Sequence, residues 1–124
     1  IGAVQGIPVC FDAKECNADT FPLQNVHEHQ IRFMEKFEQQ GGIAFLLIYY
    51  TAREELYYMQ YRQIRRFWDR AEAGGRKSFR LDELEPDWFM KLQNGFFIPS
   101  RRIWTRGIDR SRENPYNYRR VLAY

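Results

Sequence analysis

Apolar and polar positions in the first part of the chain follow a strand-like pattern and then a helical one. Alternation over residues 3–5 and 7–14, interrupted by Gly6, predicts a hairpin that turns at this glycine. Residues 16–25 are rich in Asn, Asp and Thr and predict a loop. Apolar residues then recur every three or four positions, which predicts a helix from Leu23 to Gln40 that ends at Gly41-Gly42. The residues expected on its inward face are Val26, Gln30, Phe33 and Phe37, with Ile31 and Met34 beside them.

The middle of the chain repeats strand and helix signals. The run IAFLLIYY at 43–50 is continuously apolar, which is typical of a strand covered on both faces by helices. Residues 56–61 predict a second strand, which we expect to pair with the first as an antiparallel hairpin. A helix is predicted over 62–73, ended by Gly74-Gly75. Its expected core face is Ile64, Phe67, Trp68 and Ala71.

The last part of the chain carries weaker signals. Residues 76–79 predict a short extended piece, 80–92 one or two helical turns, and 94–100 a last strand or extended segment. Beyond Ser100 the sequence is polar and interrupted by Gly and Pro, which is typical of a loosely ordered tail. The element order predicts an α/β domain with a mixed β-sheet flanked by helices over 1–100, followed by a basic tail over 101–124.

Composition narrows the class of protein. The chain of 124 residues is long enough for one modest core, and no window approaches the ~20 apolar residues that a membrane-spanning helix requires. The first residues lack the basic start and apolar core of a signal peptide, and the chain begins without Met, so we expect a fragment or a processed chain. Cys10 and Cys16 predict free thiols in a reducing cytoplasm. A zinc site would need more ligands than these two and His27 and His29.

Charge is unevenly distributed along the chain. Residues 96–124 hold seven Arg against two acidic residues, whereas residues 1–95 have a net charge of −2. This basic end on a near-neutral body favours a polyanionic partner, with a solvated Arg-rich surface as the alternative. A second group of basic residues surrounds the helix predicted over 62–73, namely Arg62, Arg65, Arg66, Arg70, Arg76, Lys77 and Arg80.

A pair of charges on a predicted strand is the first candidate for chemistry. Because strand side chains alternate, Cys10, Asp12 and Lys14 share one face of the strand over 7–14. An Asp can bind a divalent cation, and a neighbouring Lys can stabilise phosphate charge or help to deprotonate water, which together suit phosphodiester hydrolysis. A structural ion pair at the strand end is the alternative.

Gln30 is the second candidate, because it interrupts the apolar stripe of the first helix. A buried amide needs hydrogen-bond partners, and one that points at Asp12 and Lys14 would have them. The alternative is that Gln30 caps or binds a neighbouring backbone group.

Several stretches, in this order and spacing, resemble the RecU Holliday-junction resolvases of the PD-(D/E)XK nuclease superfamily. They are FDAKE at 11–15, TFPLQNVHEHQ at 20–30 and GGIAFLLIYY at 41–50, and FWDRAEAGGRKSF at 67–79 is also similar. The likeness covers roughly residues 1–85, and residues 101–124 match nothing that we can place.

The resemblance implies a restriction-endonuclease-like fold and a homodimeric endonuclease that resolves four-way DNA junctions in recombination and repair. It implies Mg²⁺ as cofactor, with Mn²⁺ as a substitute, and a cytoplasmic, nucleoid-associated location. Carried over by position, Asp12 is a metal ligand, the carbonyl of Ala13 adds a backbone ligand, and Lys14 is the catalytic lysine. Gln30 resembles the helix glutamine of these nucleases and would orient water or substrate. The role of Glu15, on the other strand face, stays open.

One departure from the family pattern concerns the metal site. The family's first catalytic acid lies on the strand before that of Asp12, and no acid precedes Asp12 in this sequence. In a complete chain the site would lack a ligand and cleavage would be doubtful; in a fragment, we expect the acid immediately upstream of Ile1.

DNA contacts are expected from the basic group around the second helix, with Arg66, Arg76 and Lys77 as the candidates. Such phosphate contacts would be salt-dependent and largely independent of sequence. The alternative is that these cations pair with acids such as Asp69 and Glu83. Two other functions stay open, a non-catalytic DNA-binding module with the nuclease fold and a phage- or restriction-type nuclease of the same superfamily.

Overall fold

The structure is a computed structural model that describes residues 2–4, 6–93 and 96–97. Its two helices are α1 (Glu28–Gln39) and α2 (Tyr61–Glu72). Its strands are β1 (Gly2–Val4), β2 (Ile7–Cys16), β3 (Thr20–Pro22), β4 (Ile43–Tyr50), β5 (Glu55–Gln60), β6 (Ser78–Arg80), β7 (Phe89–Gln93) and β8 (Phe96–Phe97). Short 3-10 turns cover Leu23–Asn25, Leu81–Glu83 and Pro86–Trp88. The basic tail predicted over 101–124 lies outside the described residues.

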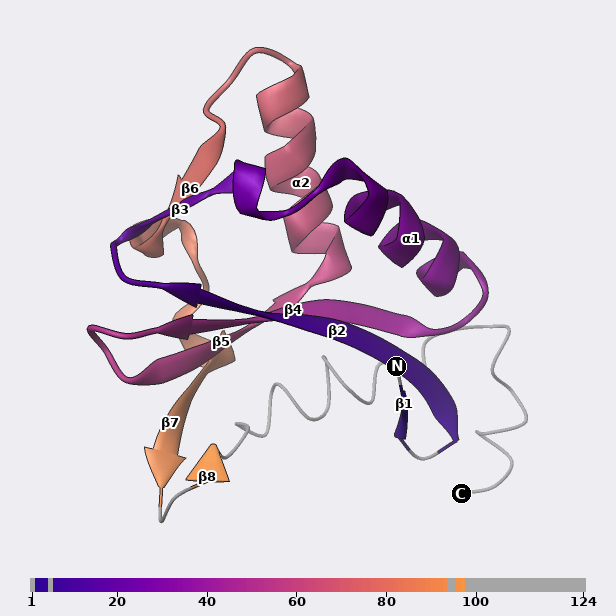
Figure 1. Cartoon of the computed structure of the whole chain (residues 1–124), viewed down its shortest axis with the longest axis horizontal. Coiled ribbons are helices and arrows are strands. Elements are labelled where there is room, and N and C mark those ends of the chain that lie inside the picture. Colours follow the sequence, from indigo (N-terminus) through magenta and orange to yellow (C-terminus); the bar gives the residue numbers. More distant parts are fainter. Residues whose placement is uncertain (1, 5, 94–95, 98–124) are drawn as a thin grey trace.

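The main sheet is mixed and has the strand order β1-β2-β4-β5-β7-β8. Only β2 and β4 are parallel among its described strand pairs, and α1 forms the crossover between them. β3 and β6 form a separate two-stranded sheet. Both helices lie on one face of the main sheet (Figure 1). This arrangement confirms the predicted α/β, restriction-endonuclease-like class. Neither described helix is long and apolar enough to cross a membrane.

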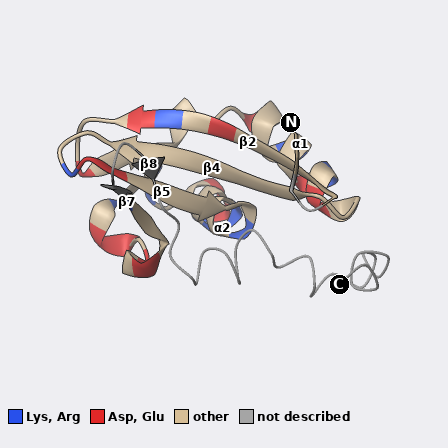
Figure 2. Cartoon of the chain, turned by 90° about the horizontal axis from the view of Figure 1, so that it is seen from below, with Lys and Arg blue, Asp and Glu red and all other residues tan. Residues whose placement is uncertain are grey.

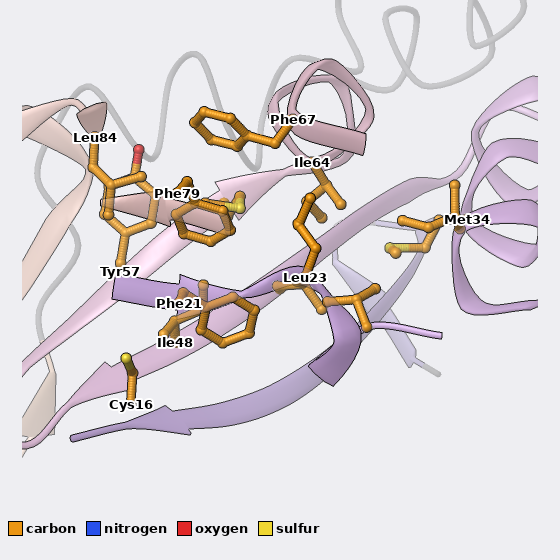
Figure 3. Close-up of a cluster of buried hydrophobic side chains, with 14 of the residues drawn as sticks. Cys16, Phe21, Leu23, Met34, Ile48, Tyr57, Ile64, Phe67, Phe79 and Leu84 are labelled. Carbon is orange, nitrogen blue, oxygen red and sulfur yellow. The ribbon is translucent and has the colours of Figure 1, made fainter. Parts of the chain in front are cut away.

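The two faces of β4 pack differently. Ala44, Leu46 and Ile48 belong to the large core beneath the helices, in which Phe67, Phe79 and Phe21 stack with ring centroids 4.7 Å and 5.0 Å apart (Figure 3). The opposite face packs against neighbouring strands and Trp88 in a smaller cluster, which includes Ile43 and Phe45. The expectation of helices on both faces of this strand is therefore wrong for the described residues.

The hairpin predictions are confirmed. β1 and β2 are antiparallel around Gly6, which has a φ of +80°, and β4 and β5 form the second predicted hairpin. Gly41 and Gly74 follow α1 and α2 with φ of +89° and +91°, a backbone region that glycine adopts without steric cost. The predicted helix ends at Gly41-Gly42 and Gly74-Gly75 are thus confirmed.

The start and inward face of the first helix differ from prediction. Residues 20–25 are not only loop, because β3 pairs with the distant β6 and a 3-10 turn follows, so α1 begins at Glu28. Its buried residues are Ile31 and Met34, whereas Phe33 is 49% exposed. The buried face is therefore rotated by about one position from the predicted stripe, because α1 packs on the sheet through Ile31 and Met34 and leaves the Phe33 ring in solvent.

The second helix is close to prediction. Ile64 and Phe67 are buried, but Trp68 and Ala71 are only partly covered. Gln63 is buried and accepts a hydrogen bond of 2.9 Å from the Tyr57 hydroxyl, a polar contact that the apolar pattern could not reveal. Further along, the helical turns expected over 80–92 are present as 3-10 turns, whereas β7 was not anticipated.

Candidate active site

Asp12 and Lys14 lie two residues apart on β2 and form an ion pair. The Lys14 Nζ atom is 2.9 Å from Asp12 Oδ2, and the two side chains are 20% and 45% exposed. Both lie on the face of β2 that carries the buried Cys10 and Cys16, toward the helix layer. Charged residues of β2 are concentrated toward its carboxyl end (Figure 2). The predicted sharing of one strand face is thus observed.

Gln30 joins this pair from the first turn of α1. Its Nε2 atom donates a hydrogen bond of 2.8 Å to Asp12 Oδ2, and its Oε1 atom accepts one of 3.1 Å from the backbone N–H of His27. The two alternatives considered for Gln30 therefore both hold. Because the helix terminus occupies the amide oxygen, the amide nitrogen is directed at Asp12.

These contacts favour the ionised form of Asp12. The hydrogen bond from Lys14 is the main reason that the pKa of Asp12 lies below its usual value, and the Gln30 bond acts in the same direction against partial burial. The lowered pKa favours an ionised Asp12 carboxylate 2.9 Å from the Lys14 Nζ atom.

A cavity of about 450 Å³ opens between β2 and α1 over this carboxylate. Its lining residues are Cys10, Phe11, Asp12, His29, Gln30, Phe33, Met34 and Leu46. Phe11 and Phe33, which are 53% and 49% exposed, are the large exposed hydrophobic side chains of the described region, and both border this cavity. The Phe33 ring thus lies at the edge of the cavity over Asp12, whereas the Phe11 ring lies on the other face of β2 and stacks on Phe45 with ring centroids 5.3 Å apart. The helical spacing predicts Phe33 only as a core residue, so its exposure is a difference between prediction and structure.

The described residues offer a sparse donor set for a divalent cation. No group of three or more His, Cys, Asp or Glu side chains that could hold a metal is present among them. What the cavity provides is the Asp12 carboxylate, and Ala13, whose carbonyl is the predicted second ligand, is not among the residues that line it. Mg²⁺ is commonly held by one or two carboxylates together with substrate phosphates and water, so this set fits such a cation in part. Cys10 and Cys16 are free and buried.

The edge of β2 beside Asp12 is free of described strands. β1 pairs with β2 only from Ile7 to Val9, in the register Gly2↔Val9, Ala3↔Pro8 and Val4↔Ile7. Residues 10–16 of β2 pair on one side with β4, and their other edge carries no strand from the described part of the chain. Asp12 and Ala13 lie in the middle of this edge.

The predicted DNA-contacting residues are all exposed, but they are not equivalent. Arg76 lies 3.5 Å from Glu83, which also binds Arg70 at 2.6 Å. Arg66 and Lys77 form no ion pair with any described side chain. Several basic residues of the group therefore pair with nearby acids, as the alternative predicts. Arg66 and Lys77 have no such partner among the described side chains and could contact phosphates.

Comparison with known proteins identifies the family. The sequence profile described as "RecU: Recombination protein U" matches residues 1–104, which extends beyond the resemblance over residues 1–85. The Holliday junction resolvase RecU of Bacillus subtilis is 45% identical over 85 residues, covering 68% of this chain and 40% of the relative. The resolvases of Staphylococcus saprophyticus and Pediococcus pentosaceus are 38% and 36% identical, covering 79% and 91% of this chain and 44% and 55% of theirs.

The chain thus spans about half the length of the curated relatives that it matches. The profile match covers most of the chain, including β2, α1 and both cavity walls around Asp12. On this match, the chain belongs to the RecU family.

Proposed function

We propose that this chain is the core of a structure-selective DNA endonuclease that resolves four-way junctions by metal-dependent phosphodiester hydrolysis. The observation that carries the proposal is the convergence of Lys14 and Gln30 on one carboxylate oxygen of Asp12, which lines a cavity together with Gln30, in a RecU-family chain. RecU relatives are described as Holliday junction resolvases, which supplies the substrate class.

The cofactor that we propose is Mg²⁺, with Mn²⁺ as a substitute. Asp12 and the carbonyl of Ala13 would hold it. When bound, such an ion lowers the pKa of a water molecule and neutralises phosphate charge.

The chain's own residues have separable roles in this mechanism. Asp12 stays ionised and accepts from Gln30 and Lys14, so its orientation is fixed before substrate arrives. The Lys14 ammonium has three N–H donors. One of them contacts Asp12, so another can bind a phosphate oxygen. Donors that are already aimed at the position of developing charge stabilise a transition state efficiently. Gln30 is a positioning residue here, since its amide contacts Asp12 and the helix terminus.

The β1–β2 register indicates where a second metal-binding acid would lie opposite Asp12. If that antiparallel register continued, the residue opposite Asp12 would be two positions before Ile1. We propose that this is where a second carboxylate completes the metal site in a longer form of the protein. The free edge at residues 10–16 is the surface on which such a strand would pair.

A junction-cleavage assay tests the proposal. The chain is incubated with a labelled four-way junction and with a duplex of the same length, in Mg²⁺ or Mn²⁺. Selective cutting of the junction that disappears in Asp12→Asn supports it. Equal cutting of both DNAs would instead indicate a phage- or restriction-type nuclease.

A second candidate is a DNA-binding module that keeps the fold without cutting. The absence of a three-carboxylate cluster among the described residues favours it. Calorimetric titration with Mn²⁺ separates the two, because metal binding that depends on Asp12 supports the nuclease, whereas junction binding with no metal uptake at millimolar Mn²⁺ supports the module.

We further propose that the protein acts on nucleoid DNA as a homodimer and that Arg66, Arg76 and Lys77 contact phosphates. Light scattering after size-exclusion chromatography tests the dimer directly; a monomer at all concentrations would contradict it.

A further inference from the structure

A second cavity lies away from Asp12, between the 3-10 turn Leu23–Asn25 and the carboxyl-terminal half of α2. Its volume is about 530 Å³, and it shares no lining residue with the cavity over Asp12. The residues that line it are Pro22, Leu23, Gln24, Trp68, Ala71, Glu72 and Lys77. This is within the size range of pockets that hold small ligands or single groups of larger ones.

The walls of this cavity are held in place independently of any ligand. The backbone N–H of Leu23 donates a hydrogen bond of 3.0 Å to the carbonyl of Lys77, which ties the 3-10 turn to the segment after α2. The Trp68 indole N–H donates one of 3.1 Å to Glu72, one turn further along the helix. The indole ring is thus fixed while its remaining apolar surface borders the cavity.

The polar groups at the rim narrow the class of ligand. Two charged side chains line the cavity, Glu72 and Lys77. Glu72 is engaged by the indole, whereas the Lys77 ammonium has no hydrogen bond or ion pair within the described residues. An apolar, aromatic cavity beside a free cation suits a planar ring that carries an anionic group.

We propose that this cavity binds an unstacked nucleobase of a DNA strand, with the base against Trp68 and an adjacent phosphate on Lys77. The proposal rests on the proposed function, which supplies DNA as the partner. Bases stack on aromatic side chains with little regard to sequence, and lysines hold the neighbouring phosphates. Residues 22–24 border this cavity and residues 29–30 border the cavity over Asp12, so a single short segment contributes to both sites.

Fluorescence tests the site directly, because the chain contains three tryptophans. We expect oligo(dT) to quench the emission of the full chain, and Trp68→Phe to remove that quenching while Trp88 and Trp104 remain. Anisotropy of labelled oligo(dT) should show binding about tenfold weaker in Lys77→Gln and in Ala71→Leu, which fills the cavity. Lys36→Gln, an equal charge change on α1, is the matched control and should bind as the parent does. Circular dichroism verifies folding.

The possible results distinguish a failure of the nucleobase site from a failure of the endonuclease proposal. If junctions and oligo(dT) bind but Trp68 emission does not respond, or if Lys36→Gln weakens binding as much as Lys77→Gln, the nucleobase site is refuted while the endonuclease proposal stands. If the chain binds no DNA at all, both fail.

Discussion

Gln30 spans from α1 to β2 with both ends of its amide engaged: Oε1 accepts from the N–H of His27 at 3.1 Å and Nε2 donates to Asp12 at 2.8 Å. A helix terminus therefore sets the orientation of a group that contacts the candidate catalytic carboxylate. Local helix chemistry and the proposed metal site are coupled through one side chain.

This coupling predicts the effect of replacing Gln30. Gln30→Leu removes a donor that lowers the pKa of Asp12, so that pKa should rise toward its ordinary value. Gln30→Glu keeps an acceptor for His27 but places a carboxylate against Asp12, and should raise the pKa further. Carboxyl-carbon NMR titration measures both. An unchanged titration in Gln30→Glu would show that the bond to Asp12 does not form in solution.

Lys14 should matter for cutting and not for DNA affinity. Lys14→Ala removes the ammonium 2.9 Å from Asp12, and loss of one such donor typically lowers kcat by about 10²–10³-fold. Junction binding, measured by anisotropy in Ca²⁺, should stay nearly unchanged because phosphate contacts elsewhere supply the affinity. Cutting at the parental rate by the variant contradicts the catalytic role.

Glu83 should contribute stability that depends on pH. A hydrogen bond from Arg70, and next the backbone N–H of Arg80, lowers the pKa of Glu83 to about 2. A folded-state pKa below the unfolded one stabilises the fold above the unfolded value and loses that contribution as pH falls toward 2.

We therefore expect Glu83→Gln to lower Tm at pH 7 and to converge with the parent near pH 2. Asp82→Asn, whose carboxylate is more exposed and 3.6 Å from Arg80, is the matched control and should change Tm little. Thermal unfolding across pH distinguishes them, and a Tm difference for Glu83→Gln that persists unchanged at pH 2 would refute this linkage.

Two neighbouring arginines of α2 should contribute differently to the salt dependence of DNA binding. Arg66 has no ion pair within the described residues, whereas Arg65 bridges Asp69 at 3.0 Å and lies 3.9 Å from Glu35 of α1. Arg66→Gln should reduce the slope of log affinity against log salt by about 1. Arg65→Gln should leave this slope unchanged. Equal slopes for Arg66→Gln and the parent would remove Arg66 from the interface.

Local sequence patterns predict most of the fold. Alternation and glycine punctuation located the β1–β2 and β4–β5 hairpins and the ends of both helices, because these features depend on neighbouring residues. The pairing of β3 with β6 and the addition of β7 depend on residues far apart in sequence, for which periodicity gives no signal.

In the candidate site too, features that depend on neighbouring residues could be predicted, whereas contacts between distant residues could not. The shared face of Asp12 and Lys14 follows from strand alternation, and the unusual position of Gln30 in an apolar stripe pointed at a polar partner. The sequence names Glu83 as a possible partner of the basic group but does not show which cations bind it. Arg70 and Arg76 both bind Glu83 because the chain after α2 brings the 3-10 turn Leu81–Glu83 back beside them.

Phe33 and Met34 give the sharpest contrast between prediction and structure. The stripe placed Phe33 inward, yet it is 49% exposed at the rim of the Asp12 cavity, whereas Met34 is 5% exposed. Phe33→Ser should change the free energy of unfolding by no more than about 0.5 kcal/mol, and Met34→Ala should cost about 2–5 kcal/mol. Because Phe33 borders the proposed active site, Phe33→Ser should raise KM for the junction without unfolding the chain. Denaturant unfolding and junction kinetics measure the two effects, and a large stability loss in Phe33→Ser would mean that this ring is buried in solution.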